Sequence, residues 1–146
     1  MLPTKLAASA AVALVSLVFI ASAETSRASP VGLWLSKDGG KLRISACQQS
    51  LCGFVAGTNP QNDPATGRPL TDKNNPDPDK RNRPLVGVQA LAVQPAGPGR
   101  WSGWLYNDDD GRTYSGTLIE LGPARIRIEG CALAILCGGE ELTRIE

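Results

Sequence analysis

The polar side chains with the greatest chemical scope fall in residues 59–84, a segment rich in proline, asparagine and aspartate. Of its three arginines, Arg81 or Arg83 could clamp a carboxylate or phosphate through paired N–H donors, and Asp72 with Asp77 could act as an acid–base pair. Asp and Asn side chains beside proline also commonly hydrogen-bond their own backbone, and spacing within a loop fixes no geometry. We therefore assign no catalytic role here, and predict ligand contacts for Asp72, Asn75, Asp77, Arg81 and Arg83.

Histidine is absent from the chain, which excludes Ser–His–Asp and Cys–His catalysis and most transition-metal sites. The run 108–111, Asp-Asp-Asp-Gly, invites a calcium-loop interpretation. Aligning Gly111 with the sixth loop position, however, puts Tyr106 first and Thr117 twelfth, where carboxylates are required. We interpret the run as a solvated acidic turn and expect no metal, no cofactor and no enzymatic activity. A carboxylate hydrolase, the remaining catalytic alternative, needs two carboxyl groups about 5 to 9 Å apart in a cleft.

Five large aromatic side chains lie in segments with strand character. In the stretch from 100 to 107, Trp101 points to one face of an extended chain and Trp104 with Tyr106 to the other. Inside a barrel such rings either fill the core or line a ligand cavity. With core packing as the alternative, the candidate ligand contacts are Trp34, Trp101, Trp104, Tyr106 and Tyr114.

The first 23 residues have the order of a cleavable signal peptide. Lys5 supplies a basic start, residues 6–20 are almost wholly apolar, and residues 21–23, Ala-Ser-Ala, form a small-x-small cleavage site. Because a membrane span needs roughly 20 apolar residues, an uncleaved anchor is the lesser alternative, as is a later cut after Ala28. We expect export to the periplasm, cleavage after Ala23, a short linker over 24–30, and no membrane span in the mature chain.

The four cysteines form an even number in a chain that we expect to be exported, which favours two disulfides. We favour Cys47 with Cys52 and Cys131 with Cys137, because each pair brackets a predicted turn. Cross-linking the two turns stays open as an alternative pairing. A zinc site of four thiolates is the functional rival, although the spacings are wide for it.

Residues 31–146 read as one β-rich domain. Apolar and polar residues alternate over 41–46 and 125–130, as in strands with one wet face. Residues 100–107 and 112–121 flank an Asp-Gly turn and predict a hairpin. Eight short antiparallel strands favour an up-and-down barrel over the alternative, a β-sandwich. The remaining strands are expected at 31–36, 53–58, 86–94 and 140–146.

The long polar segment 59–84 interrupts this pattern. A connection of this length within a compact domain is usually functional or disordered. It holds six of the chain's 11 prolines, and proline restricts both itself and its predecessor. We therefore expect a stiff loop, which serves either as a lid or as a surface for a partner.

The charge balance argues against nucleic acid and anionic lipid as partners. The chain has 15 Lys and Arg against 14 Asp and Glu, and Lys5 is lost with the signal peptide. Electrostatic capture of either partner needs clustered positive charge, which neither the total nor its distribution provides.

A set of short motifs covers nearly the whole mature chain, at residues 31–34, Cys47, 51–53, 74–77, 83–87, 110–116 and 130–131. Taken together, these motifs resemble an uncharacterised family of exported bacterial proteins, domain of unknown function family 2147. The resemblance implies a lipocalin-like, calycin-type barrel in the envelope of Gram-negative bacteria, with a small-molecule ligand and no known catalytic residue. The sequence Gly32-x-Trp34 also resembles the first lipocalin signature.

The sequence thus predicts a periplasmic barrel that binds a small, largely apolar ligand. The alternative is an envelope protein that binds another protein through loop 59–84 and holds no ligand.

Overall fold

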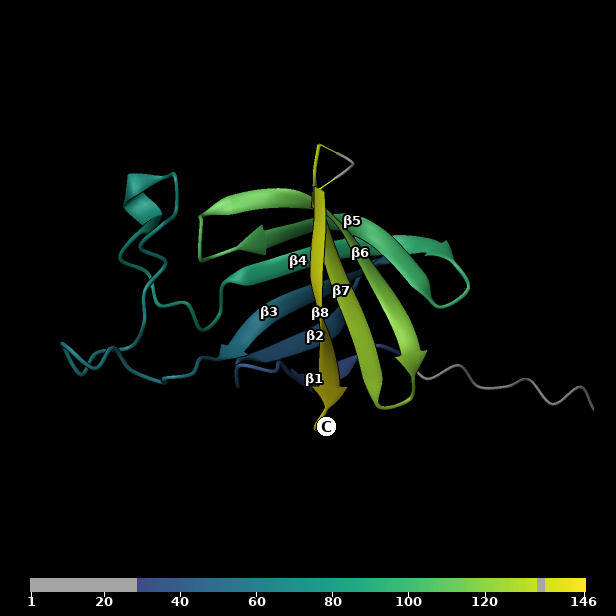
Figure 1. Cartoon of the computed structure of the whole chain (residues 1–146), viewed down its shortest axis with the longest axis horizontal. Helices are drawn as coiled ribbons and strands as arrows, with labels where there is room; N and C mark the ends of the chain where they lie inside the picture. Colours follow the sequence, from purple (N-terminus) through teal and green to yellow (C-terminus); the bar gives the residue numbers. More distant parts are fainter. Residues whose placement is uncertain (1–28, 134–135) are drawn as a thin grey trace, which may run out of the picture.

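The computed structural model describes residues 29–133 and 136–146. Eight antiparallel strands in chain order close into an up-and-down barrel, which confirms the predicted fold and rules out the sandwich (Figure 1). The predicted signal peptide and most of the predicted linker lie outside the described residues. The strands are β1 (Gly32–Leu35), β2 (Lys41–Cys47), β3 (Ser50–Gly57), β4 (Gln89–Gly97), β5 (Arg100–Asn107), β6 (Arg112–Gly122), β7 (Arg125–Ala132) and β8 (Leu136–Arg144).

The barrel closes where β1 pairs with β8, with Trp34 opposite Arg144 and Leu35 opposite Thr143. These two residue pairs join the first strand to the last. Because side chains alternate along each strand, one set faces inward. That set supplies the core, which comprises Trp34, Leu42, Ile44, Leu51, Leu91, Val93, Leu118, Ile126 and Leu142.

One end of the barrel is sealed around Trp34, which is fully buried. Its indole Nε1 donates a hydrogen bond to the Pro30 carbonyl at 2.8 Å, and the Arg144 guanidinium lies 4.3 Å from the ring centroid. Arg144 also donates to the carbonyls of Ser29, Val31 and Pro123. The residues before β1 are thereby held across this end of the barrel.

Two strand pairs run further than the sequence pattern predicts. β3 begins at Ser50, and β8 at Leu136, because the ladders continue through both cysteine pairs. The structure holds disulfides Cys47–Cys52 and Cys131–Cys137, which confirms the favoured pairing. Both disulfides fit an oxidising compartment.

The segment between β3 and β4 is folded. Isolated bridges join Asn62 to Pro69 and Thr71 to Pro84, and a single 3-10 turn, η1, spans Pro78–Lys80. Figure 1 shows this segment projecting to one side of the barrel. Within the described residues, no helix has the length and apolar character to cross a membrane.

Candidate functional site

A cavity of about 960 Å³ opens at the end of the barrel away from Trp34. Antiparallel order places four connections at this end: the β1–β2 turn, the long β3–β4 segment, the β5–β6 turn and the β7–β8 turn. Residues of the first three connections line the cavity, and beside the fourth the strand ends Ala132 and Leu136 do so. The volume is within the range of small-molecule sites, about 300 to 1,000 Å³.

The cavity has room because one inward position on each of β7 and β8 is a glycine. Gly130 and Gly138 pair across the two strands and both line the cavity. A Cβ built on Gly138 would meet nothing within 4 Å. On β6, by contrast, Leu105 fills the space over Gly116, where a Cβ would lie 2.2 Å from the Leu105 Cγ.

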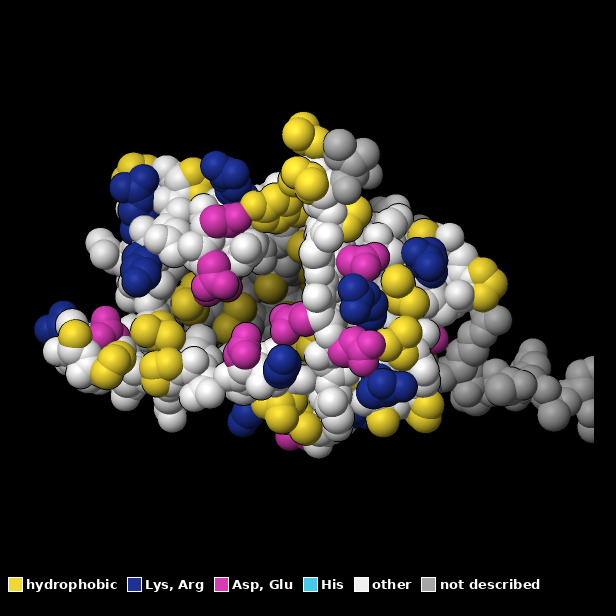
Figure 2. Space-filling model, in the orientation of Figure 1, with side chains coloured by type: hydrophobic (Ala, Val, Ile, Leu, Met, Phe, Trp, Pro, Cys, Tyr) yellow, Lys and Arg dark blue, Asp and Glu magenta, His cyan; other side chains and the backbone are white. Residues whose placement is uncertain are grey.

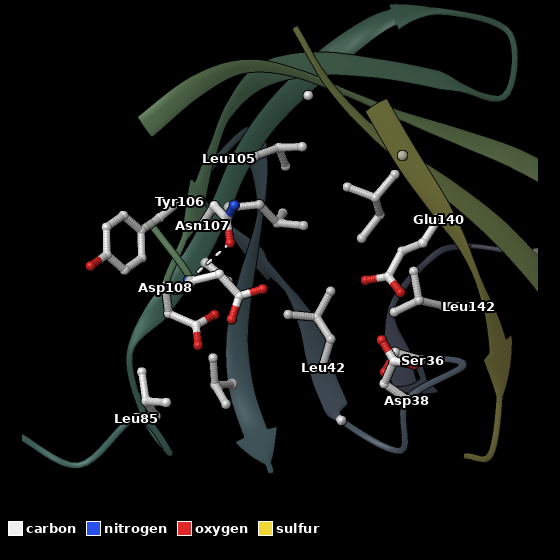
Figure 3. A pocket seen from close by; sticks show the side chains of 18 of the residues that line it. Ser36, Asp38, Leu42, Leu85, Leu105, Tyr106, Asn107, Asp108, Glu140 and Leu142 are labelled. Atoms are coloured by element: carbon white, nitrogen blue, oxygen red, sulfur yellow. Dashed lines mark hydrogen bonds between the residues drawn. The ribbon is translucent and has the colours of Figure 1, made fainter. Parts of the chain in front are cut away.

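The floor of the cavity is apolar. It is formed by leucine and isoleucine side chains that also pack against the core, so its shape is fixed by the same contacts that stabilise the barrel. Figure 3 shows Leu42, Leu105 and Leu142 directed into the space. The floor residues are Leu42, Leu91, Leu105, Ile128 and Leu142.

The rim of the cavity is acidic. Asp38 comes from the β1–β2 turn, Asp108 and Asp109 from the β5–β6 turn, and Glu140 from an inward position of β8 opposite Ile128. Figure 2 shows carboxylates around a hollow whose floor is hydrophobic, and in Figure 3 the Glu140 side chain extends into the cavity. We call these four residues the acidic rim.

Burial and neighbouring charge disfavour ionisation of two rim groups. Burial raises the pKa of Asp108, and the Asp109 and Asp72 carboxylates raise it further. Burial also raises the pKa of Glu140, and here the added repulsion comes from Asp38 and Asp109. The rim carboxylates therefore repel one another electrostatically across the mouth of the cavity.

Beside the rim lies a hydrogen-bonded network around Asp72, whose side chain is fully buried. Oδ2 accepts from Asn75 Nδ2 at 2.8 Å and from Arg83 Nε and Nη2 at 3.0 and 2.8 Å. Oδ1 accepts from the Tyr106 hydroxyl at 2.5 Å. Through Tyr106 on β5, the network ties the long segment to the barrel.

The network sets the ionisation of its members. Burial alone would raise the pKa of Asp72, but hydrogen bonds from Tyr106, Asn75 and Arg83, with the Arg83 charge, outweigh it and hold the pKa below its ordinary value. Burial and the bond to Asp72 raise the pKa of Tyr106 to about 12. At neutral pH the network is an ionised carboxylate held by a neutral phenol and a guanidinium.

A second contact fixes the long segment against the β5–β6 turn. Asn74 Nδ2 donates to the carbonyls of Asp108 and Asp109 at 2.9 and 3.0 Å. Gly111 has a φ of +70°, and a Cβ there would lie 1.8 Å from the Asn74 carbonyl oxygen. Only glycine permits this approach of the two backbones.

The comparisons with known proteins agree with this geometry. The model of a family described as an uncharacterized protein conserved in bacteria, DUF2147, matches residues 32–144. The chain belongs to this family. Among curated proteins none matches. The match confirms the resemblance noted in the sequence.

Two solved structures resemble this DUF2147 barrel. Protein HP1028 from Helicobacter pylori, described as belonging to the lipocalin family, aligns with a TM-score of 0.65 at 17% identity, covering 80% of this chain and 82% of its own. At that identity the likeness establishes the fold: a lipocalin-like barrel. A redesigned beta barrel aligns with a TM-score of 0.45 at 16% identity, over 80% of this chain and 91% of its own.

The five aromatic candidates occupy different places in the DUF2147 barrel. Tyr106 and Tyr114 line the cavity, and Figure 3 shows the Tyr106 hydroxyl directed away from it. Trp34 lies in the core, and Trp101 packs against the core. Trp104 is exposed. The tryptophans are therefore not among the cavity-lining residues.

The five polar candidates fall into two groups, neither of which lines the cavity. Asp72, Asn75 and Arg83 meet in the network. Asp77 accepts from the Asp79 N–H at the start of η1, and Arg81 donates to the carbonyls of Asn75 and Pro76. These last two bind the loop's own backbone, the alternative that their setting beside proline suggested.

The sequence interpretation missed the acidic rim. Asp108 and Asp109 were assigned to a solvated turn, and Asp38 and Glu140 were not singled out. One available signal was register: with Leu142 inward on β8, Glu140 two residues earlier must face inward too. A carboxylate at an inward barrel position indicates a site.

Proposed function

We propose that this protein binds a small, largely apolar ligand inside the barrel. The observation that carries the proposal is the open cavity of about 960 Å³ with a leucine-rich floor. A fold that needed only a packed core would place bulky side chains where Gly130 and Gly138 stand. An apolar floor with a few polar groups at the rim is the usual form of a small-molecule site.

The ordered loop supports this reading. Leu70 and Leu85 flank the part of the β3–β4 segment that holds Asp72, Asn75 and Arg83, and both line the cavity. The Leu85 N–H donates to the Leu70 carbonyl at 2.9 Å. The segment thus forms part of the entrance wall. Its tip, around η1, stays exposed.

The ligand proposal is tested by extracting the purified protein with organic solvent and analysing the extract by mass spectrometry. A compound present in stoichiometric amount, and absent from a parallel extract of an unrelated exported protein, is the expected result. No such compound, together with no binding of the neutral apolar dye Nile red, would refute the proposal.

A second candidate is a protein-binding role for the loop. It is favoured by the outward projection of an internally hydrogen-bonded segment (Figure 1). Replacing exposed Lys80 and Arg81 at its tip by glutamate would then abolish co-purification of an envelope partner. Equal recovery of the same partner with both forms would count against this role.

The proposed compartment is the periplasm, with residues 1–23 removed on export. The supporting observations are the order of residues 1–23 and two disulfides. Sequencing the amino terminus of the protein from a periplasmic extract should begin at Glu24. Recovery of Met1 in the cytoplasmic fraction would contradict it.

A further inference from the structure

Charge is unevenly distributed between the cavity and the rest of the chain. The whole chain is nearly neutral, with a formal net charge of +1. The residues lining the cavity nevertheless include the four carboxylates of the acidic rim and a single cation, Lys41. The negative charge at the mouth is therefore local to the site and does not follow from overall composition.

Within the part of the chain that the structure describes, the rim carboxylates form no ion pairs. In the described ranges, no Lys or Arg nitrogen lies within ion-pair distance of Asp38, Asp108, Asp109 or Glu140. The neighbour of Glu140 on the opposite face of β8 behaves differently, since Glu141 pairs with Arg125 at 3.2 Å. Asp108 is half-buried, whereas Asp38, Asp109 and Glu140 are exposed. The pKa values of Asp108 and Glu140 are nevertheless raised by loss of hydration and by neighbouring carboxylates, so their unpaired negative charge is disfavoured.

The arrangement does not suit a bare metal ion. Among residues 29–133 and 136–146, no three acidic or cysteine side chains come together closely enough to hold one. The rim groups stand on three separate elements around the mouth, above an apolar floor (Figure 3). An apolar floor favours a ligand with a hydrophobic portion, and an acidic rim favours a ligand that also carries a positive charge.

We propose that the ligand of this cavity is a cationic amphiphile, with its alkyl or aryl portion on the leucine floor and an ammonium group among Asp38, Asp108, Asp109 and Glu140. This inference rests on the proposed ligand-binding function and specifies the ligand's class. An ammonium donates charge-assisted hydrogen bonds to carboxylates. The Tyr114 ring, also in the cavity wall, can contribute a cation–π contact.

The test uses the exported protein with dodecylamine, dodecanol and dodecanoic acid as competitors for Nile red, below their micelle concentrations. We expect dodecylamine to compete best and dodecanoic acid worst. Glu140→Gln should weaken dodecylamine about tenfold, the value of one charge-assisted hydrogen bond at a partly exposed site. The same change should leave dodecanol unaffected, and Glu141→Gln, the outward-facing control, should change neither affinity.

A pH series adds a second readout. The raised pKa values of Glu140 and Asp108, with Asp38 and Asp109 facing them and Lys41 on the same wall, should weaken dodecylamine binding as the pH falls from neutral toward the ordinary carboxyl range. Dodecanol should show no such dependence. In the Glu140→Gln, Asp108→Asn double variant, the affinities for dodecylamine and for dodecanol should show the same dependence on pH.

The outcomes separate the two proposals. If Nile red binds but dodecanol or dodecanoic acid competes as well as dodecylamine, the cavity binds ligands and the cationic assignment is wrong. If Glu140→Gln and Glu141→Gln have equal effects on dodecylamine, the rim does not recognise charge. If Nile red does not bind to a folded protein and the solvent extract holds no compound, the ligand-binding function fails and the cationic assignment fails with it.

Discussion

The Asp72 network gives the sharpest test of how the long segment is held. Replacing Asp72 with Asn preserves size but removes the charge that Arg83 and the Tyr106 hydroxyl bind. The new amide has two possible orientations. In one, its N–H groups face Arg83 and Asn75, which are themselves donors. In the other, its oxygen accepts from Arg83 and Asn75, and its N–H group faces the Tyr106 hydroxyl. At least one buried hydrogen bond of the network is lost in either orientation.

The expected cost follows from burial. Breaking a buried ion pair by removing one partner costs about 3 to 5 kcal/mol. Here the Asp72 side chain is fully buried but the Arg83 side chain is 40% exposed, so the freed guanidinium regains water and the expected loss is about 2 to 3 kcal/mol. For a domain of this size, that corresponds to a fall in Tm of roughly 10 °C.

The assay is urea unfolding of wild type, Asp72→Asn and Asp77→Asn at about pH 7. Asp77 provides the control: Asn can still cap η1 through its side-chain oxygen, and the change removes only the surface ion pair with Lys80 at 3.4 Å, which is worth about 0 to 1 kcal/mol. Because the pKa of Asp72 is held below 3.8, its contribution is present above that value and lost as the pH falls below it. An Asp72→Asn protein no less stable than Asp77→Asn at about pH 7 would refute the anchoring role.

Three further predictions concern stability. Arg144→Ala should lower the free energy of unfolding by about 2 kcal/mol, because it removes the cation–π contact with Trp34 and three hydrogen bonds to carbonyls; a thermal midpoint equal to wild type would contradict this. Gly111→Ala should lower the thermal midpoint more than Gly67→Ala does. Both glycines have positive φ, but of the two only Gly111 would bring a Cβ against backbone atoms, those of Asn74. Equal midpoints would show that the Asn74 contact does not form. Stability should rise slightly as the pH falls from neutral toward the ordinary carboxyl range, because the raised pKa values of Asp108 and Glu140 favour their neutral forms in the folded state; the rise should vanish in the Glu140→Gln, Asp108→Asn variant.

The barrel fold could be predicted from the sequence because the signals for its strands and turns are local. Alternation over 41–46 and 125–130, together with the Asp-Gly turn, depends on near neighbours in the chain, and these elements appear as predicted in β2, β7 and the β5–β6 hairpin. The disulfide pairing was also accessible, since each pair closes its own hairpin.

The site was harder to predict because it depends on closure. Whether Gly130 and Gly138 leave a cavity depends on which side chains of other strands approach them, and the atoms nearest to a Cβ at Gly130 belong to Leu105 and Tyr114. The meeting of Asp72 with Tyr106 joins residues 34 positions apart, and no local pattern specifies it. The acidic rim likewise combines residues from β8 and from two turns far apart in the sequence.

The central claim, that the cavity holds the ligand, is tested most directly by filling it. Gly138→Trp places an indole where a Cβ meets no atom within 4 Å, so the barrel should fold with an unchanged thermal midpoint. Glu141→Trp adds the same group to the outer face of β8 as a control. Loss of Nile red binding in Gly138→Trp alone is the predicted result; a folded Gly138→Trp that binds the dye as tightly as wild type would contradict the claim.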